Sequence, residues 1–400
     1  MTRTLFSGAT IVDGTGADPA VADLAVEDDR IVEVGPGLDG DERVDLTGKA
    51  LLPGLFDCHT HVTLSTIDQN RNAQTPFSYR FYQAMANLEA TLRIGITSVR
   101  DAGGADLGIK QAVADGLIRG PRMQISLSMV SQTGGHGDPW TASGAELQFF
   151  PRHPGVPDTI VDGPDEMRRT VRALVRMGAD VIKVAVSGGV LSPRDKPTHA
   201  HFRQAELDVL VEEATAAGIF VMAHAQATPG IKNGIRAGIR SIDHGIYLDD
   251  EAIKMMLDRG TWLVPTLVAP RGVIDAAEAG SAIPPQAVAK AREVAEIHRA
   301  SFAKAVAAGV KVAMGTDSGV TPHGDNLREL ALMVDGGMTP MQALVATTSS
   351  AAELMGVEGE LGTLEPGKRA DLVVVDGDPL DVATLDRRIS AVYQDGVKVV

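Results

Sequence analysis

Both ends of the chain carry the same pattern of short apolar runs. Near the N-terminus, runs rich in Val and Ile and broken by Gly and Asp are TRTLFSGATIVDG (2–14), ADLAVEDDRIVEVGPG (22–37) and ERVDLTGKALLPG (42–54). The pattern returns in ADLVVVDGDPL (370–380) and ISAVYQDGVKVV (389–400). Apolar runs of this length between turn residues predict β-hairpins. We therefore predict one small β domain that is assembled from both ends, residues 1–52 and 364–400.

The middle of the chain alternates between short apolar strands and longer helices. Predicted strands include DVIKVAVSGG (180–189), IFVMAHAQ (219–226) and VKVAMGTDSG (310–319), and predicted helices include DEMRRTVRALVRMGA (165–179) and RQAELDVLVEEATAAG (203–218). Strands that alternate with helices predict a parallel sheet. About eight such units fit an α/β fold, a (β/α)8 TIM barrel, over residues 53–363. An open doubly wound sheet is the alternative, but no Gly-x-Gly-x-x-Gly follows an early strand.

Two connections between these elements are long. One covers residues 131–163 and contains TGGHGDPW, and the other covers residues 269–285. In a barrel, both would follow strands and lie at the mouth formed by the carboxyl ends of the strands. Long loops at that position are usually functional.

Composition excludes several classes of function. Of the 400 residues 44% are apolar and 4% are aromatic, which predicts a large aliphatic core. A net charge of -15 argues against nucleic-acid or anionic membrane partners. The single cysteine, Cys58, allows no internal disulfide, and the N-terminus lacks the apolar region of a signal peptide. We expect a cytoplasmic homo-oligomer that acts on a small molecule.

The stretch LLPGLFDCHTHVTL (51–64) begins as an apolar strand and then becomes polar. Side chains alternate between the faces of a strand, so Asp57, His59 and His61 share one face and Cys58 packs on the other. Two imidazoles at this spacing can bind one metal ion, although a pair of core histidines is the alternative.

Metal-competent side chains also end other predicted strands, namely His224, His244 and Asp317. Lys183 lies alone in an apolar strand, where an unpaired charge is costly. Its amine could pair with a carboxylate. Alternatively, burial could lower its pKa so that the neutral amine takes up carbon dioxide and becomes a carbamate.

Together these residues resemble the metal-dependent amidohydrolase superfamily. The match is His59-x-His61, Lys183, His224, His244 and Asp317, with the tail LGTLEPGKRADLVVVDGDPL (361–380). The segments VAVSGGV, TGGHGD and IDHGIYLDD are most similar to prolidase-like (Xaa-Pro dipeptidase) and imidazolonepropionase-related members. Mononuclear deaminases usually carry a Glu shortly after the strand-five histidine, whereas this chain reads His224-Ala225-Gln226.

The resemblance implies a small β-sandwich domain beside the barrel and a site with two divalent metal ions, most often zinc. His59, His61 and Asp317 would hold one ion, His224 and His244 the other, and carbamylated Lys183 would bridge them. Asp317 would move the proton, while Asp57 would orient one of the histidines of its strand. His136 would donate to the carbonyl oxygen or serve as an ordinary loop residue, Tyr247 would reach a substrate carboxylate, and His199 and His201 would be loop residues.

The implied activity is hydrolysis of a peptide-like amide bond by a metal-bridging hydroxide. The expected substrates are dipeptides or N-acyl amino acids, cleaved as by a carboxypeptidase or prolidase, including aromatic amides of the ochratoxin type. Hydrolysis of a cyclic amide or imidazolone, a carbamate or an ester is the alternative. A third hypothesis is a scaffold of the same fold without catalysis, against which the complete set of six metal-site residues argues.

Overall fold

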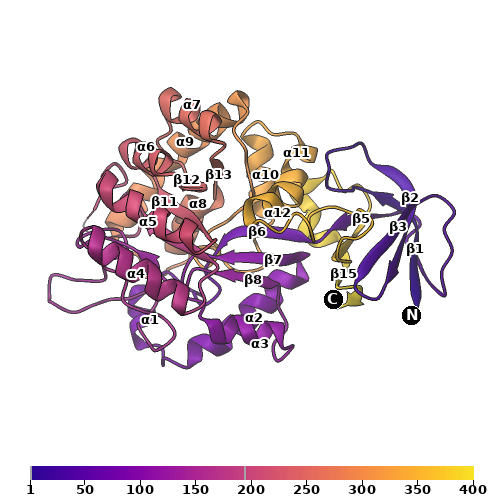
Figure 1. Ribbon diagram of the computed structural model, residues 1–400, viewed down its shortest axis with the longest axis horizontal. Helices are drawn as coiled ribbons and strands as arrows, with labels where there is room; N and C mark the ends of the chain where they lie inside the picture. Colours follow the sequence, from indigo (N-terminus) through magenta and orange to yellow (C-terminus); the bar gives the residue numbers. More distant parts are fainter. Residues whose placement is uncertain (1, 193–194) are drawn as a thin grey trace.

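The computed structural model describes residues 2–192 and 195–400. Figure 1 shows two parts, a small sheet that lies beside both chain termini and a larger α/β part that contains most of the helices. The described helices and strands alternate through the middle of the chain, as the hydrophobic pattern predicts.

The small sheet has eight strands drawn from both ends of the chain. Its order is β16-β15-β14-β5-β1-β2-β3, and β4 pairs with β1. β5 joins the two ends because it pairs in parallel with β1 and antiparallel with β14. The apolar side chains buried against this small sheet include Phe6, Leu24 and Leu372. The strands are β1 (Arg3–Ile11), β2 (Ala20–Glu27), β3 (Arg30–Gly35), β4 (Glu42–Asp45), β5 (Lys49–Pro53), β14 (Leu372–Asp376), β15 (Ile389–Gln394) and β16 (Val397–Lys398).

Two parallel sheets form the centre of the larger part. One has the order β13-β12-β11-β10-β9 and the other β6-β7-β8. Residues 311–318 connect them, because Val312 pairs in parallel with Leu263 of β13 and Ser318 pairs in parallel with Thr60 of β6. The strands are β6 (Leu55–Thr60), β7 (Ile96–Asp101), β8 (Arg122–Ile125), β9 (Met129–Val130), β10 (Val181–Ala185), β11 (Phe220–Ala225), β12 (Ser241–His244) and β13 (Trp262–Val264).

Helices lie around these sheets (Figure 1). Several end at glycines with positive φ, such as Gly238 after α6 and Gly309 after α9, where a side chain would be strained. The helices are α1 (Gln69–Gln74), α2 (Tyr79–Arg93), α3 (Leu107–Ala114), α4 (Pro164–Arg176), α5 (Gln204–Ala216), α6 (Thr228–Ala237), α7 (Asp250–Arg259), α8 (Val268–Glu278), α9 (Pro285–Ala308), α10 (Arg328–Asp335), α11 (Pro340–Ala346) and α12 (Ser349–Met355), with a 3-10 helix η1 at Val382–Arg388.

The two long connections differ from each other. Residues 131–163 contain no described helix or strand, as expected, and several of their side chains line the pocket described below. The expectation of a loop over 269–285 is wrong, because α8 (Val268–Glu278) occupies most of it. Pro270 does not prevent this helix, because it lies in the first turn, where a helix does not need its N–H group.

Cys58 belongs to an apolar cluster with Phe56, Trp262 and Val264. Burial raises the pKa of its thiol to about 12, so the side chain is a neutral packing group. Among the residues that the structure describes, no helix is long and apolar enough to cross a membrane.

Candidate metal centre and substrate pocket

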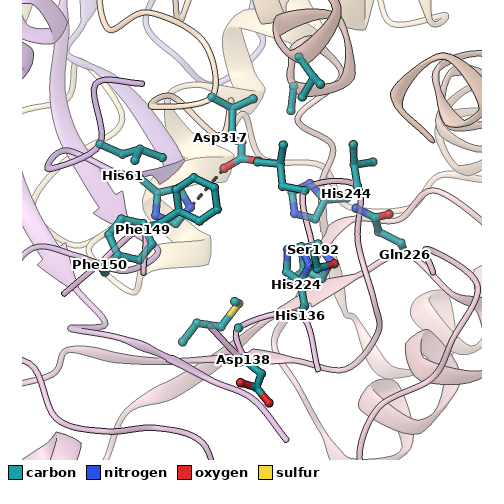
Figure 2. Close-up of a pocket in the computed structure, with 18 of the residues that line it drawn as sticks. His61, His136, Asp138, Phe149, Phe150, Ser192, His224, Gln226, His244 and Asp317 are labelled. Carbon is teal, nitrogen blue, oxygen red and sulfur yellow. Dashed lines mark hydrogen bonds and ion pairs between the residues drawn. The ribbon is translucent and has the colours of Figure 1, made fainter. Parts of the chain in front are cut away.

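The six predicted metal-site residues meet in one pocket. His59 lies near the end of β6, and His61 follows that strand. Lys183 lies in β10, while His224 and His244 lie at the ends of β11 and β12. Asp317 belongs to the segment that connects the two parallel sheets. All six line a cavity of about 170 Å³, much of which is drawn in Figure 2.

Three of the histidines use one ring nitrogen as an anchor. Nδ1 of His61 donates to the Gly103 carbonyl oxygen at 2.9 Å, and Nε2 of His224 donates to the Gly188 carbonyl oxygen at 3.1 Å. Nδ1 of His244 is hydrogen-bonded to Oγ1 of Thr266 at 2.6 Å. The other ring nitrogen of each therefore remains available as a ligand, which is how protein histidines are usually arranged around metals.

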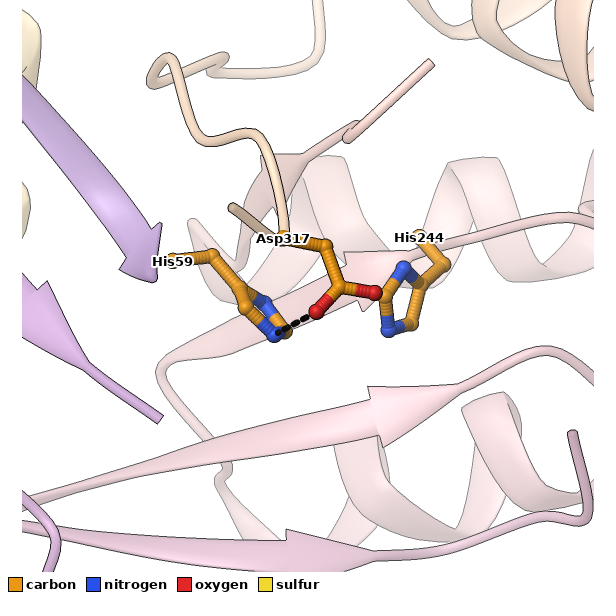
Figure 3. Close-up of side chains that lie close together, drawn as sticks. All are labelled: His59, His244 and Asp317. Carbon is orange, nitrogen blue, oxygen red and sulfur yellow. Dashed lines mark ion pairs between the residues drawn. The ribbon is translucent and has the colours of Figure 1, made fainter. Parts of the chain in front are cut away.

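Asp317 lies close to His59, to His61 and to His244. Its Oδ1 lies 3.2 Å from Nε2 of His61 and 3.5 Å from Nε2 of His59. Ligand atoms of His59, His244 and Asp317 all lie within 4.8 Å of one another (Figure 3). Burial alone would raise the pKa of the Asp317 carboxyl, but the contact with His61 and the other nearby histidines hold it well below its usual range. Ionised carboxylate and neutral imidazole ligands fit a divalent metal ion.

Lys183 is buried beside this group. Its Nζ donates to Oδ2 of Asp243 at 2.9 Å and lies 3.5 Å from Nε2 of His59. Burial lowers the pKa of the amine, and the neighbouring Asp243 opposes that shift only in part. Of the two interpretations of Lys183, the pairing with a carboxylate has its partner in Asp243. The amine also lies close to His59, one of the candidate metal ligands.

Asp243 and Arg100 are site residues that the sequence reasoning missed. Oδ2 of Asp243 lies 3.0 Å from Nδ1 of His59, and Oδ1 lies 3.5 Å from Nη2 of Arg100. Arg100 is also buried and donates from Nε to the Cys58 carbonyl oxygen at 2.7 Å. An acid directly before His244 was the available signal. In a regular strand, the side chains of Asp243 and His244 would point to opposite faces of the sheet. The positive φ of His244, 73°, departs from that geometry, so both side chains reach the site.

Asp57 does not contact a histidine ring, although it was expected to orient one of the histidines of its strand. Its carboxylate accepts from the backbone N–H of His59 at 3.0 Å, from Oγ1 of Thr316 at 2.6 Å and from Nδ2 of Asn326 at 2.8 Å. It therefore contacts the backbone of His59, whereas Asp243 contacts the ring. The Asp57 carboxyl is fully buried, and its hydrogen-bond donors lie away from the imidazole rings.

His136 lies in the pocket, whereas Tyr247 does not line it. The ring of His136 stacks on that of His224, with centroids 4.0 Å apart and an interplanar angle of 17°. Burial lowers the pKa of His136. Tyr247 is half-buried and is not among the described side chains that line this cavity, although its backbone N–H donates to Gln226. The lining of the cavity therefore does not support the expected contact between Tyr247 and a substrate carboxylate.

Three other histidines differ in position. His199 is exposed, and His201 is buried with Nε2 3.8 Å from Oδ2 of Asp195. His298 of α9 lines the pocket and donates from Nε2 to the His244 carbonyl oxygen at 2.8 Å. This position could not be predicted from the sequence, because His298 is an isolated histidine on the buried face of α9.

The walls of the pocket are mainly apolar. Phe150 stacks on His61 with ring centroids 5.0 Å apart. Figure 2 shows Phe149 and Phe150 beside His61, with Asp317 and His244 above His136 in this view. Loop 131–163 supplies many of the walls, which fits the expectation that this loop is functional. The larger apolar residues of the lining are Leu64, Met129, Trp140, Leu147, Phe149, Phe150, Val190, Leu191, Ile246, Val273 and Val320.

The chain is similar to known hydrolases over almost its whole length. An ochratoxinase of Aspergillus niger is 35% identical over 94% of this chain and 82% of that protein. An imidazolonepropionase of Rhizorhabdus wittichii is 27% identical over 93% and 90%. A crystal structure of a prolidase complexed with N-methylphosphonate-L-proline superposes with a TM-score of 0.92 and 35% identity, covering 100% of this chain and 99% of that one. The sequence pattern of the amidohydrolase family matches residues 50–399, and this chain belongs to that family.

Proposed function

We propose that this chain is a binuclear metal-dependent hydrolase of a peptide-like amide bond. The substrate would be a dipeptide or an N-acyl amino acid. The observation that carries the proposal is the position of His59, His244 and Asp317, whose ligand atoms lie within 4.8 Å of one another in a largely apolar pocket. Similarity to an ochratoxinase and to a prolidase supports an amide bond as the target.

The ligand roles that we propose are supported by the common pocket that all six side chains line. His59, His61 and Asp317 would hold one ion, and His224 and His244 the other. Lys183 would act as a carbamate between them, which its burial and its 3.5 Å distance from Nε2 of His59 support. We propose zinc, because imidazole and carboxylate ligands suit it. Such ions polarise a carbonyl group and lower the pKa of water to about 7.

In this proposal, Asp317 would move the proton of the reaction. The lowered pKa of its carboxyl supports this role, because an ionised carboxylate can accept a proton from the attacking water. Water oxygen bonds to the amide carbon, the carbon–nitrogen bond breaks, and the proton passes from Asp317 to the leaving nitrogen. His136 lines the same cavity and is assigned to substrate contact.

The lining of the pocket supports substrates with a bulky apolar or aromatic group. Trp140, Phe149 and Phe150 line it together with aliphatic side chains. Burial of an aromatic group there would supply binding energy, while the metal-site residues fix the scissile bond. An aromatic N-acyl amino acid has both features, an aromatic group for the apolar walls and an amide bond for the metal site.

The proposed architecture is a closed (β/α)8 barrel over residues 53–363 with a β-sandwich domain from residues 1–52 and 364–400. The pairing of residues 311–318 with both β13 and β6 supports closure on one side. β8 and β9 are separated by three residues and pair with β7 and β10, which supports closure on the other side. In that architecture the pocket lies at the carboxyl ends of the strands.

Hydrolysis of an imidazolone or another cyclic amide is the second candidate, because an imidazolonepropionase is among the relatives. The test is a library of dipeptides, N-acyl amino acids and cyclic amides, incubated with metal-stripped and zinc-reconstituted protein. We expect zinc-dependent release of amino acids from linear amides. Turnover of cyclic amides alone would favour the second candidate. Intact protein that neither binds metal nor hydrolyses any substrate would favour a scaffold.

A further inference from the structure

Arg80 is a buried arginine that has no carboxylate partner among the residues that the structure describes. It belongs to α2, and only 7% of the residue is exposed. Nη1 donates to the Phe149 carbonyl oxygen, and Nη2 donates to the Asn72 carbonyl oxygen at 3.2 Å. Nε is buried and has no hydrogen-bond partner in the described part of the chain. Two carbonyl groups therefore hold a positive charge that no neighbouring side chain neutralises.

This environment is unfavourable for a charged side chain. Burial lowers the pKa of Arg80, and no described carboxylate opposes that shift. Lys183 and Arg100 are also buried, but both contact Asp243, at 2.9 Å and 3.5 Å. An arginine keeps its proton in proteins, and a buried charge is normally paired with an opposite one. Arg80 therefore lacks a partner of the kind that an anion supplies.

A small cavity lies beside Arg80. Its volume is about 20 Å³, which accommodates one water molecule or one monatomic ion but no organic group. Three aromatic rings contribute to its walls, those of Phe77, Phe81 and Phe150. None of the described side chains that line it is a carboxylate or an amide. The side chains around this cavity thus include a cation and supply no negative charge.

The polar side chains of this cavity are hydrogen-bond donors. Thr63 contributes a hydroxyl group, and Arg80 contributes its guanidinium. Nδ1 of His153 accepts from the backbone N–H of Gly155 at 3.1 Å, and burial lowers the pKa of this histidine although Asp106 lies 4.0 Å from the same nitrogen. In the neutral ring the hydrogen is therefore on Nε2, which is also a donor.

We propose that this cavity binds one small inorganic anion of the chloride type beside Arg80, Thr63 and His153. The anion would supply the countercharge that the buried guanidinium lacks. A water molecule would fit the same space, but it would leave the charge of Arg80 without compensation. Phosphate, sulfate and organic carboxylates are too large for a cavity of this volume.

Phe150 connects the anion site with the substrate pocket. Its ring lines both cavities and stacks on His61 (Figure 2). Arg80 also holds the carbonyl oxygen of Phe149, whose side chain lines the substrate pocket. An anion that fixes the guanidinium would therefore fix this aromatic wall. This consequence rests on the proposed function: the anion should lower KM for an aromatic N-acyl amino acid and leave kcat unchanged.

The position of the anion can be determined without any turnover. Crystals of zinc-reconstituted protein would be grown with sodium bromide, because bromide replaces chloride and is identified by its anomalous scattering. We expect an anomalous peak between Arg80, Thr63 and His153 in the wild-type protein and none there in Arg80→Met. If Arg80→Met does not fold, Thr63→Val takes its place and should weaken the peak. Density for water without an anomalous peak in the wild-type protein would overturn the proposal.

Binding in solution is tested by thermal unfolding at constant ionic strength. Chloride at about 200 mM, in place of methanesulfonate, should raise Tm of the wild-type protein by at least about 2 °C, because a ligand of the folded state stabilises it. Arg80→Met should show no such rise, whereas Arg119→Met, which removes an exposed arginine, should keep it. A bromide peak in crystals without this rise in Tm would mean binding at crystal concentration only and would overturn the proposal.

The same pair of salts tests the effect on the substrate pocket. We expect chloride to lower wild-type KM for an N-acyl phenylalanine at least about threefold, because a fixed wall reduces the cost of ordering on binding. Arg80→Met keeps all six metal-site residues, so any direct effect of chloride on zinc appears in both proteins. An unchanged KM would show that the anion does not act on the pocket. If no amide is hydrolysed in either salt, the proposed function is wrong, while the bromide peak and the rise in Tm still decide the anion site.

Discussion

Nζ of Lys183 and Oδ2 of Asp243 lie 2.9 Å apart in the interior of the protein, and both side chains are almost completely buried. The same Asp243 oxygen lies 3.0 Å from Nδ1 of His59. One carboxylate therefore holds a candidate bridging ligand and a candidate metal ligand in place. We therefore expect the geometry of the centre to depend on Asp243.

Replacement of Asp243 should destabilise the protein strongly. In Asp243→Ala, the charges of Lys183 and Arg100 remain buried without their carboxylate, which typically costs about 3–5 kcal/mol. We expect a decrease of that size in the free energy of unfolding, measured by urea denaturation of metal-free protein. Asp258→Ala is the matched control, because Asp258 pairs with Lys254 at 2.6 Å on the surface and should change stability little. Equal effects of the two replacements would contradict the role of Asp243.

Lys183 should be required for a full complement of metal. Lys183→Ala removes the proposed bridge, so we expect fewer than two ions per chain by elemental analysis and a loss of hydrolysis of at least about a hundredfold. Intact-mass measurement of wild-type protein under native conditions, with 13C-bicarbonate, should show the additional carboxylate. A Lys183→Ala variant with two ions and full activity would show that the carbamate bridge is wrong.

Phe150 should contribute to substrate binding through its ring. The ring lines the pocket and stacks on His61, so Phe150→Ala removes apolar surface from the binding site. We expect KM for an aromatic N-acyl substrate to rise about tenfold, and Phe150→Leu to have a smaller effect. Tyr82→Ala serves as control, because Tyr82 is 66% exposed and lies outside this pocket. If Phe150→Ala leaves KM unchanged, the substrate does not contact the Phe150 ring and this prediction is wrong.

Glu329 should make stability depend on pH. Burial raises the pKa of its carboxyl to about 8, although the backbone N–H groups of Leu267 and Val268 donate to it. Between about pH 5 and pH 8 the unfolded state ionises this group while the folded state keeps the proton. The free energy of unfolding therefore falls as the pH rises through this range.

Glu329→Gln removes that titration, so its stability should fall less over the same range, by a difference of more than about 1 kcal/mol. A constant offset is also expected, because the Gln NH2 group cannot accept from the second backbone N–H. Urea denaturation at several pH values compares the slopes. Parallel pH profiles of the two proteins would contradict the raised pKa.

The sequence was sufficient to predict the six residues that meet in the pocket. His59, His224 and His244 lie near or at strand ends, and parallel strands bring their carboxyl ends to one edge. The prediction of a loop over residues 269–285 was wrong, because α8 covers most of that range and Pro270 occupies its first turn. The missed features depend on contacts between distant segments or on local backbone. Asp243 reaches the site beside His244 because of one positive φ, and Ser192 reaches His136 across 56 positions of the chain.

The most direct test of the central claim is the initial rate at which phenylalanine is released from an N-acyl phenylalanine. It would be measured for metal-stripped protein, zinc-reconstituted protein and zinc-reconstituted Asp317→Asn under one set of conditions. The account predicts release by the reconstituted wild-type protein alone, with rates lower by at least about a hundredfold in the other two. Equal release by stripped and reconstituted protein, or full activity of Asp317→Asn, would contradict it.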